Sequence, residues 1–370
     1  MSNNIYYESF ERMEDFMTRA FTAIGVPEED AKTCAAVLIE SDKRGIDSHG
    51  VGRFKPIYID RINEGIQFVN TQFEVVRETK TTAVVDGHDG MGHVIGVKSM
   101  QMAIDKAKEY GMGMVAVRNS THYGIAGYYA IMAAKEGMIG ITGTNARPSI
   151  APTFGVENML GTNPLTIGFP TDEEFPFILD CATSITQRGK IEHYARIKKE
   201  MPVGWVIDHE GNPVTDPEVA LKGFGTGTCA LAPLGGIGED LAGYKGYGYA
   251  TVVEVLSAAL QSGSFLKALN GVDANGNKRP YHLGHFFIAI DINAFVSVEE
   301  FKKTAGDILR ELRASAKAKG HDRIYTAGEK EYLAFLERSK TGIPLNAAVR
   351  KSLQDARDQL KVDFKFVWEE

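Results

Sequence analysis

Cysteine is scarce in this chain, and its three cysteines, Cys34, Cys181 and Cys229, lie far apart with no C-x-x-C spacing. This pattern is typical of free thiols in a reducing compartment, and it argues against a disulfide framework or a thiolate metal site. We therefore expect free cysteines and a cytoplasmic location.

Long apolar runs are also missing. No stretch approaches the roughly 18 uninterrupted apolar residues that a membrane-spanning helix needs. The first residues, MSNNIYYESFERMEDF, contain no basic segment followed by an apolar run, so we expect no signal peptide. The sequence predicts neither a membrane-spanning segment nor a membrane partner.

An excess of basic residues is absent as well, because the formal net charge is −7. A nucleic-acid-binding surface needs clustered Lys and Arg to neutralise phosphates. The most basic stretches, at 196–199 and 317–319, are short and have acidic neighbours. We therefore expect no nucleic-acid partner.

The usual nucleotide and metal signatures are missing too. No G-x-G-x-x-G lies between a strand and a helix, no P-loop spacing occurs, and no H-x-x-x-H pair is present. The dinucleotide fingerprint works by bringing backbone N–H groups close to a pyrophosphate. Its absence excludes an ordinary Rossmann motif, and the histidine spacing predicts no metal site.

Both ends of the chain are predicted to be helical. The 370 residues exceed the size at which a single core usually stops growing, which favours two lobes. Apolar residues recur at helical spacing near the N-terminus and again after residue 297. Helices are expected over 9–25, 27–45, 53–65, 298–320, 329–340 and 346–360.

The middle of the chain alternates short apolar runs with amphipathic stretches, which is typical of an α/β lobe with a mixed sheet. The segment 204–244 is rich in Gly and Pro and is expected to form loops. We predict an N-terminal helical segment at 1–72, a central α/β cofactor-binding domain at 73–297, and C-terminal helices at 298–370 that pack with the N-terminal segment. Strands are expected over 73–78, 81–87, 114–120, 138–145, 165–170, 175–183 and 285–292, and helices over 94–111, 126–137, 188–200 and 245–263.

Three polar motifs lie in glycine-rich loops between apolar elements: DSHGVGR at 47–53, NSTHYG at 119–124 and GTNP at 161–164. The second follows a strand, and ligands bind at that end of α/β sheets. Oxidation of a 2-hydroxy acid needs a base near neutral pKa and a cation for the carboxylate. If the loops converge, this set is supplied by His122, His49, Arg53, Ser48 and Asn163.

Each of these residues has an ordinary structural interpretation. A loop histidine is more often a hydrogen-bonding residue than a catalyst, and Ser48 beside Asp47 is suited to capping a helix. Asp180, at the end of an expected strand, is suited to binding loop amides. Two other classes stay open: a metal hydrolase built on His49, His122 and Asp180, and a catalytically silent binding protein.

Taken together, the motifs resemble the type 2 malate/L-lactate dehydrogenase family, whose relatives include L-sulfolactate dehydrogenase, ureidoglycolate dehydrogenase and 2,3-diketogulonate reductase. The resemblance covers nearly the whole chain. It is carried by SHGVGR at 48–53, NSTHYG at 119–124, GTNP at 161–164, DCATS at 180–184, RGK at 188–190, GYKGYG at 243–248 and YTAGE at 325–329.

The resemblance implies a nicotinamide-binding fold that is not Rossmann-like, with a central mixed sheet and a helical lobe built from both termini. It also implies a homodimer. His122 resembles the family's general base, whereas His49 has the proton-transfer role in other members; we favour His122. Arg53 would hold the substrate carboxylate with help from Ser48, and Asn163 would also contact substrate.

The resemblance implies NAD as cofactor, with NADP as the alternative. Lys245 at a glycine-flanked helix start is suited to a pyrophosphate. Many relatives have Pro at the position of Ala327. The implied cofactor contacts are Asp180, Cys181, Ala182, Ser184, Thr186, Lys245, Ala327, Gly328 and Glu329.

The run QRGKIEHYARIKKEMPVGWVID is most similar to malate-type members. A dicarboxylate needs a second cation, for which Arg188, Lys190 and Arg147 are candidates. We predict interconversion of L-malate and oxaloacetate. The alternatives are an L-lactate, sulfolactate or ureidoglycolate dehydrogenase, and an NADPH-dependent imine or 2-oxo-acid reductase.

Overall fold

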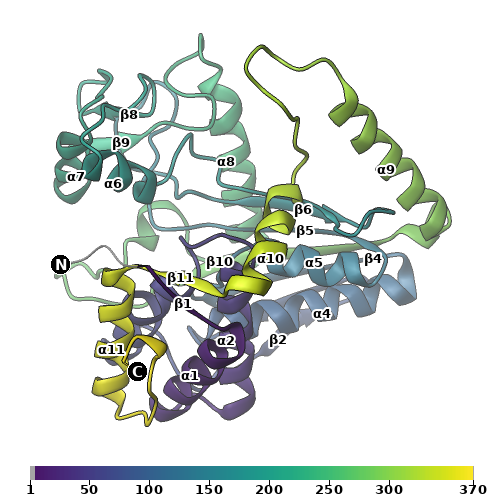
Figure 1. Cartoon of the computed structure of the whole chain (residues 1–370), viewed down its shortest axis with the longest axis horizontal. Helices are drawn as coiled ribbons and strands as arrows, with labels where there is room; N and C mark the ends of the chain where they lie inside the picture. Colours follow the sequence, from purple (N-terminus) through teal and green to yellow (C-terminus); the bar gives the residue numbers. More distant parts are fainter. Residues whose placement is uncertain (1–4, 370) are drawn as a thin grey trace.

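The computed structural model describes residues 5–369, which form a helical lobe, a central sheet and a smaller subdomain (Figure 1). The central sheet has the strand order β2-β3-β4-β10-β5-β6-β7. Strands β3 and β4 are parallel neighbours, and the other adjacent pairs are antiparallel, so the sheet is mixed as predicted. The strands are β2 (Glu74–Glu78), β3 (Thr82–Asp86), β4 (Met112–Ser120), β5 (Met138–Thr144), β6 (Leu165–Phe169), β7 (Phe177–Cys181) and β10 (Leu283–Asp291).

Helices α4 (Gly92–Tyr110) and α5 (Gly127–Lys135) cover one face of this sheet, and α8 (Gly243–Ala258) lies on the other (Figure 1). The close approach of α4 to β4 depends on Gly113. A Cβ added there would lie 2.1 Å from the carbonyl oxygen of Ala103, so no larger residue fits.

The helical lobe brings the two ends of the chain together. Helices α1 (Phe10–Ala23), α2 (Glu28–Lys43) and α11 (Ala347–Leu360) share one core, and β1 (Tyr6–Glu8) pairs with β11 (Ile343–Leu345). Aromatic rings fill this core, because burying them contributes a large hydrophobic free energy. The rings include Phe16, Phe21, Phe54, Tyr58 and Phe366.

The two other C-terminal helices differ in their packing. Helix α10 (Glu329–Thr341) contacts α2, whereas α9 (Val298–Ala314) packs at the far end of β6. There Phe301 meets Phe169 with 5.9 Å between ring centroids, and Arg310 forms an ion pair with Asp172. The predicted packing of the C-terminal helices with the N-terminal segment, and the domain boundaries at 72 and 297, stay predictions.

The segment 204–244 corrects a sequence prediction, because it is not simply loops. It contains β8 (Val206–Asp208), α7 (Pro217–Thr226) and β9 (Cys229–Leu231), which pack with α6 (Arg188–Arg196) in the small subdomain. Helix α7 has the expected start signals, with Asp216 accepting N–H bonds from Glu218 and Val219 ahead of Pro217. Its glycines lower helix propensity and concealed it.

The helix expected over 53–65 is broken into three turns. A 3₁₀ turn spans Val51–Arg53, a π-helical turn spans Phe54–Ile59, and α3 covers Asp60–Asn63. Pro56 lies in the π-helical turn, where its missing N–H disturbs the hydrogen-bond ladder. This irregular segment carries Arg53 and Tyr58.

Two expectations concern the chain as a whole. The cysteines Cys34, Cys181 and Cys229 are all free, as predicted. Within residues 5–369, no helix combines the length and apolarity that crossing a bilayer would take.

Candidate active site

The carboxyl ends of several strands meet at one edge of the sheet. Strands β3, β4, β5 and β7 all point the same way, because β10 and β6 run antiparallel between them. Asp180 is the second-last residue of β7, and His122 follows β4. This edge is where ligands bind in α/β sheets.

A buried histidine connects three strands at the same edge of the sheet. The Nε2 atom of His285 lies 2.8 Å from Ser120 Oγ, and its Nδ1 atom lies 2.7 Å from Thr144 Oγ1, which links β4, β10 and β5. Burial lowers the pKa of His285 to about 3, so this ring stays neutral. His285 therefore has a structural role beneath the site.

The loop at 47–53 lies against His122. The rings of His49 and His122 stack with centroids 5.8 Å apart and planes 14° from parallel. Two contacts hold the loop there: the buried carboxylate of Asp42 accepts the N–H of Val51 at 2.7 Å, and Arg338 pairs with Asp47 at 2.5 Å. The two predicted histidine motifs do converge.

His122 has a defined orientation. Its Nδ1 atom lies 2.6 Å from the hydroxyl of Tyr58 and 3.4 Å from the N–H of Gly124. The same Tyr58 hydroxyl lies 2.8 Å from Nε2 of His93. Because Nδ1 is already engaged, Nε2 is the nitrogen of His122 that is left for a ligand.

Both stacked histidines are neutral near pH 7. Burial, followed by the charge of Arg53, lowers the pKa of His49 to about 4. Burial also lowers the pKa of His122 well below its usual value, with smaller contributions from the neighbouring His49 and from the guanidinium groups of Arg61 and Arg53. A neutral imidazole has a lone pair to accept a proton, so the site provides two potential bases.

Arg53 and Ser48 are the other predicted site residues of the loop at 47–53. The Nε–H of Arg53 donates to the carbonyl oxygen of Ser48 at 2.5 Å, while the hydroxyl of Ser48 lies 2.8 Å from Nδ1 of His49. The terminal amino groups of Arg53 have no carboxylate partner among the described residues. They have the paired geometry that grips a carboxylate.

The side-chain amide of Asn163 has no unpaired N–H group to offer a ligand. Its side chain is fully buried, and its amide N–H groups donate to Ala250 O at 3.1 Å and Glu254 Oε2 at 2.8 Å. Its amide oxygen accepts the N–H of Ala146. The amide groups of Asn163 thus have protein partners, and its contact with substrate stays a prediction.

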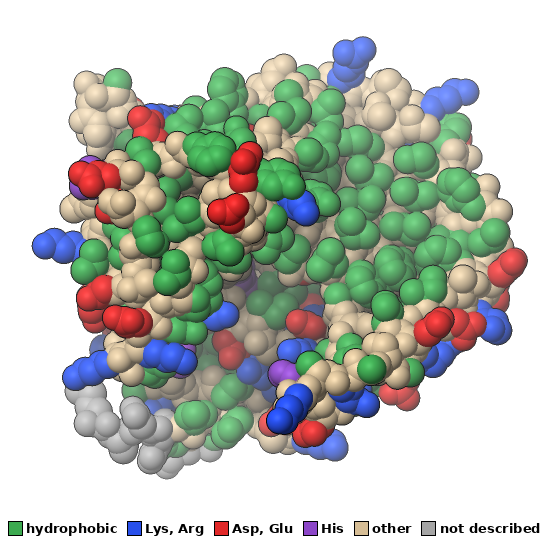
Figure 2. Space-filling view, turned by 90° about the horizontal axis from the view of Figure 1, so that it is seen from above, with side chains coloured by type: hydrophobic (Ala, Val, Ile, Leu, Met, Phe, Trp, Pro, Cys, Tyr) green, Lys and Arg blue, Asp and Glu red, His purple; other side chains and the backbone are tan. Residues whose placement is uncertain are grey.

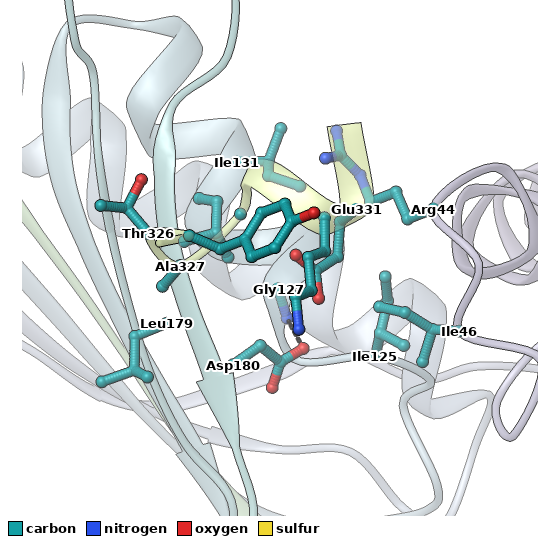
Figure 3. A pocket seen from close by; sticks show the side chains of 14 residues that line it. Arg44, Ile46, Ile125, Gly127, Ile131, Leu179, Asp180, Thr326, Ala327 and Glu331 are labelled. Carbon is teal, nitrogen blue, oxygen red and sulfur yellow. Dashed lines mark hydrogen bonds between the residues drawn. The ribbon is translucent and has the colours of Figure 1, made fainter. Parts of the chain in front are cut away.

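A cavity of about 340 Å³ lies between β7 and the start of α10 (Figure 3). The predicted cofactor residues Asp180, Ala327 and Gly328 line it together with the first turn of α5. The carboxylate of Asp180 accepts the N–H of Gly127 at 2.7 Å and the hydroxyl of Thr166 at 2.8 Å. Burial raises the pKa of Asp180. Asp180 therefore binds a backbone amide, which is the structural interpretation that the sequence suggested.

The loop after β7 contains polar groups that lack partners. Ser184 and Thr186 are nearly buried, and neither hydroxyl has a hydrogen-bond partner among the described residues. Cys181 and Ala182 precede them on the same strand end and are partly exposed. Buried polar groups are normally paired, so these hydroxyls remain available for a hydrogen bond to a water or a ligand.

Two of the predicted cofactor residues differ in how accessible their charged groups are to a ligand. Lys245 is exposed in the first turn of α8, where a cation and the helix N-terminus are suited to a phosphate. Glu329 is only 2% exposed; its carboxylate pairs with Arg323 and accepts the N–H of Thr326. Glu329 therefore holds the loop at 326–328, and its contact with cofactor stays a prediction.

Three functional candidates were missed by the sequence. Tyr58 contacts His122, His93 contacts Tyr58 in turn, and Asp42 anchors the loop at 47–53. No local signal marks them: Asp42 and Tyr58 lie within expected helices, and His93 directly precedes one. Within residues 5–369 no set of three or more His, Cys, Asp and Glu side chains is arranged to hold a metal ion; the prediction that none takes part remains a prediction.

Known proteins are similar to this chain over nearly its whole length. A family model described as malate/L-lactate dehydrogenase covers residues 9–354. Malate dehydrogenase of Pyrococcus horikoshii is 44% identical over 353 residues, 95% of each chain. L-sulfolactate dehydrogenase of Methanocaldococcus jannaschii is 40% identical, over 92% of this chain and 93% of that protein. The crystal structure of malate dehydrogenase from Entamoeba histolytica superposes with a TM-score of 0.94, at 45% identity, over 98% of this chain and all of that chain.

The fold, the paired histidines and these matches define a 2-hydroxy acid dehydrogenase, a class that in this family uses a nicotinamide cofactor. The mixed sheet without a Rossmann fingerprint is thereby confirmed. More narrowly, the chain belongs to the malate/L-lactate dehydrogenase family.

Proposed function

We propose that this enzyme interconverts L-malate and oxaloacetate with NAD. The observation that carries the proposal is the stack of His49 on His122 beside Arg53. Relatives described as malate dehydrogenases, at 44% and 45% identity, support malate over the other acids.

In the proposed mechanism Arg53 holds the C1 carboxylate through its two terminal amino groups. His122 exchanges a proton with the C2 oxygen at Nε2, because Tyr58 and Gly124 occupy Nδ1. Ser48 orients His49 in the same way, which leaves Nε2 of His49 to hydrogen-bond the substrate. The nicotinamide, when bound, accepts or supplies the hydride at C2.

The cofactor site is proposed to use the hydroxyls of Ser184 and Thr186 and the ammonium group of Lys245. We favour NAD because acidic residues suit free ribose hydroxyls, whereas a 2′-phosphate needs a cation. Asp180 and Glu331 line the cavity, and its Arg44 already pairs with Glu40 at 2.7 Å. Lys330 is the remaining cation of that cavity.

The second carboxylate of malate needs a second cation. Arg147 and Arg188 line one small pocket of about 170 Å³ together with Ser149. The ammonium of Lys190 instead lies over the ring of Trp205, 5.0 Å from its centroid. We therefore retain Arg147 and Arg188 as candidates, although Arg188 also pairs with Glu192 at 3.1 Å.

A panel of 2-oxo acids assayed with NADH and with NADPH tests the proposal. The expected result is the highest kcat/KM for oxaloacetate with NADH. A higher value for pyruvate, sulfopyruvate or a cyclic imine would replace malate, and a higher value with NADPH would replace NAD. Arg188→Gln should lower kcat/KM for oxaloacetate while leaving pyruvate reduction unchanged.

We also propose a cytoplasmic homodimer. Hydrophobic side chains gather on the face above the sheet, beside α8 and α9 (Figure 2). Large exposed apolar patches usually mark interfaces. Light scattering at micromolar concentration should give twice the chain mass, and a monomeric mass would contradict the dimer. The exposed apolar residues of these helices include Tyr249, Val252, Val255, Ile308 and Leu312.

A further inference from the structure

A fully buried tyrosine joins His122 to a second, fully buried histidine. The hydroxyl of Tyr58 lies 2.6 Å from His122 Nδ1 and 2.8 Å from His93 Nε2, and both Tyr58 and His93 are 0% exposed. Tyr58 comes from the irregular turn Phe54–Ile59, and His93 from the first turn of α4. The three groups form a continuous chain of hydrogen bonds that leads away from the substrate side.

This chain has two internally consistent proton arrangements. In the first, His93 Nε2–H donates to the oxygen of Tyr58, whose hydroxyl donates to His122 Nδ1, so His122 carries its proton on Nε2. In the second, every proton has moved along by one bond, and His122 Nε2 is free to accept. The N–H of Gly124, a pure donor facing Nδ1 at 3.4 Å, favours the first arrangement.

The far end of the chain is open. Nδ1 of His93 is buried and has no hydrogen-bond partner among the described residues. A buried polar nitrogen without a partner is costly, and ordered water commonly satisfies such atoms. This nitrogen is thus a point at which a water molecule can give or take a proton.

The surroundings oppose a charged intermediate at His122. Arg53, Arg61 and His49 all lie close enough to lower its pKa, in addition to its burial. Burial likewise lowers the pKa of His93 to about 3. A proton transfer that ends with a buried imidazolium would add a cation beside two guanidinium groups, which is unfavourable.

We infer that Tyr58 and His93 are positioning residues that form a charge-neutral proton relay behind His122. This rests on the proposed role of His122. In reduction, the Nε2 proton of His122 passes to the substrate oxygen, and the hydroxyl proton of Tyr58 passes to Nδ1 of His122. The Nε2 proton of His93 then passes to Tyr58, and a water molecule passes a proton to Nδ1 of His93 and takes one back from bulk solvent. After the product leaves, Nε2 of His122 takes a proton from solvent and the transfers along the relay run back, which restores the first arrangement. Oxidation reverses each transfer, so both rings stay neutral throughout.

The test is a proton inventory of the single-turnover rate. Enzyme preloaded with NADH is mixed with oxaloacetate in H₂O/D₂O mixtures, and nicotinamide absorbance is followed by stopped flow. Several protons in transit predict a rate that curves with deuterium fraction in the wild type. Tyr58→Phe breaks the chain, so we expect a rate at least about tenfold lower and a linear inventory.

Two further variants distinguish a proton relay from a purely structural role of Tyr58 and His93. His93→Gln keeps an N–H donor for Tyr58 but cannot exchange protons between two nitrogens, so it should also give a slow, linear inventory. Tyr129→Phe removes another fully buried tyrosine hydroxyl, which donates to the carbonyl of Tyr123, and should keep the curved inventory. Thermal unfolding and NADH affinity are measured for each variant to confirm that the site remains folded.

A linear inventory or no solvent isotope effect in the wild type would overturn the relay, as would a curved inventory in Tyr58→Phe. These outcomes leave the dehydrogenase assignment intact. If the wild type reduces no 2-oxo acid of the panel with either cofactor, the proposed substrate and cofactor fail instead.

Discussion

The imidazole rings of His49 and His122 lie nearly parallel, 14° apart with 5.8 Å between centroids, although they come from a loop of the helical lobe and from the end of a sheet strand. Arg53 lies close enough to both rings to lower the pKa of each. In the proposed mechanism, the helical lobe therefore supplies the arginine that binds the carboxylate, and the sheet supplies the imidazole that exchanges the proton.

His122→Ala should lower kcat by at least about 10²-fold, because a positioned base contributes roughly 10²–10⁴-fold. Cofactor affinity should stay similar, since His122 is placed on the substrate side. Steady-state kinetics with oxaloacetate and NADH titration check both. His209→Ala, in an exposed turn, is the control. Near-normal turnover of His122→Ala would move the base role to His49.

Arg53→Ala should raise KM for the acid while changing kcat less. Losing a charge-assisted hydrogen bond costs about 1.5–3 kcal/mol, which corresponds to roughly 10–100-fold in KM. Arg53→Lys keeps the charge but not the paired geometry, so it should recover only part of the affinity. An unchanged KM in Arg53→Ala would remove Arg53 from the site.

Ser184→Ala should weaken NADH binding without destabilising the free enzyme. Its buried hydroxyl has no protein partner among the described residues, so its removal costs the free enzyme no hydrogen bond. A lost bond to the cofactor corresponds to roughly 2–12-fold in Kd. Fluorescence titration and thermal unfolding measure the two effects.

Ser99→Ala is the matched control for this measurement. Ser99 on α4 is also buried, and its hydroxyl also lacks a partner. It should alter stability as little as Ser184→Ala does, with unchanged NADH affinity. Equal affinities for Ser184→Ala and wild type would exclude the hydroxyl of Ser184 from the cofactor site.

Asp42→Asn should stabilise the protein increasingly as pH rises. Burial raises the pKa of Asp42 to about 8, whereas an unfolded Asp titrates near about 3.9. Between these values the folded state binds more protons, so wild-type stability falls as pH increases. Asparagine retains an acceptor for the N–H of Val51 and never ionises.

Thermal unfolding of wild type and Asp42→Asn from about pH 4 to about pH 9 checks this expectation. The difference in Tm should grow up to about pH 8 and then level off. Asp355→Asn, on the exposed side of α11, should show no such growth. A difference for Asp42→Asn that stays constant over this range would show that Asp42 has the same pKa folded and unfolded.

The sequence predicted the long elements well, because burial on one face leaves a strong periodic pattern. The expected helices over 9–25 and 94–111 match α1 and α4, and the expected strand over 114–120 matches β4. It failed at β8, α7 and β9, where strands of three residues show no alternation and glycines weaken the helix pattern.

The sequence by itself determined the chemistry on offer: the histidine and arginine types, their glycine-rich loops, and the absence of a Rossmann fingerprint. Only the tertiary structure decided which side chains remain available. Asn163 has its amide N–H groups satisfied by Ala250 and Glu254, which lie far along the chain. Tyr58, from the helical lobe, links His122 to His93. A hydrogen bond depends on the spatial positions of two groups, and those positions follow from packing between segments far apart in the chain.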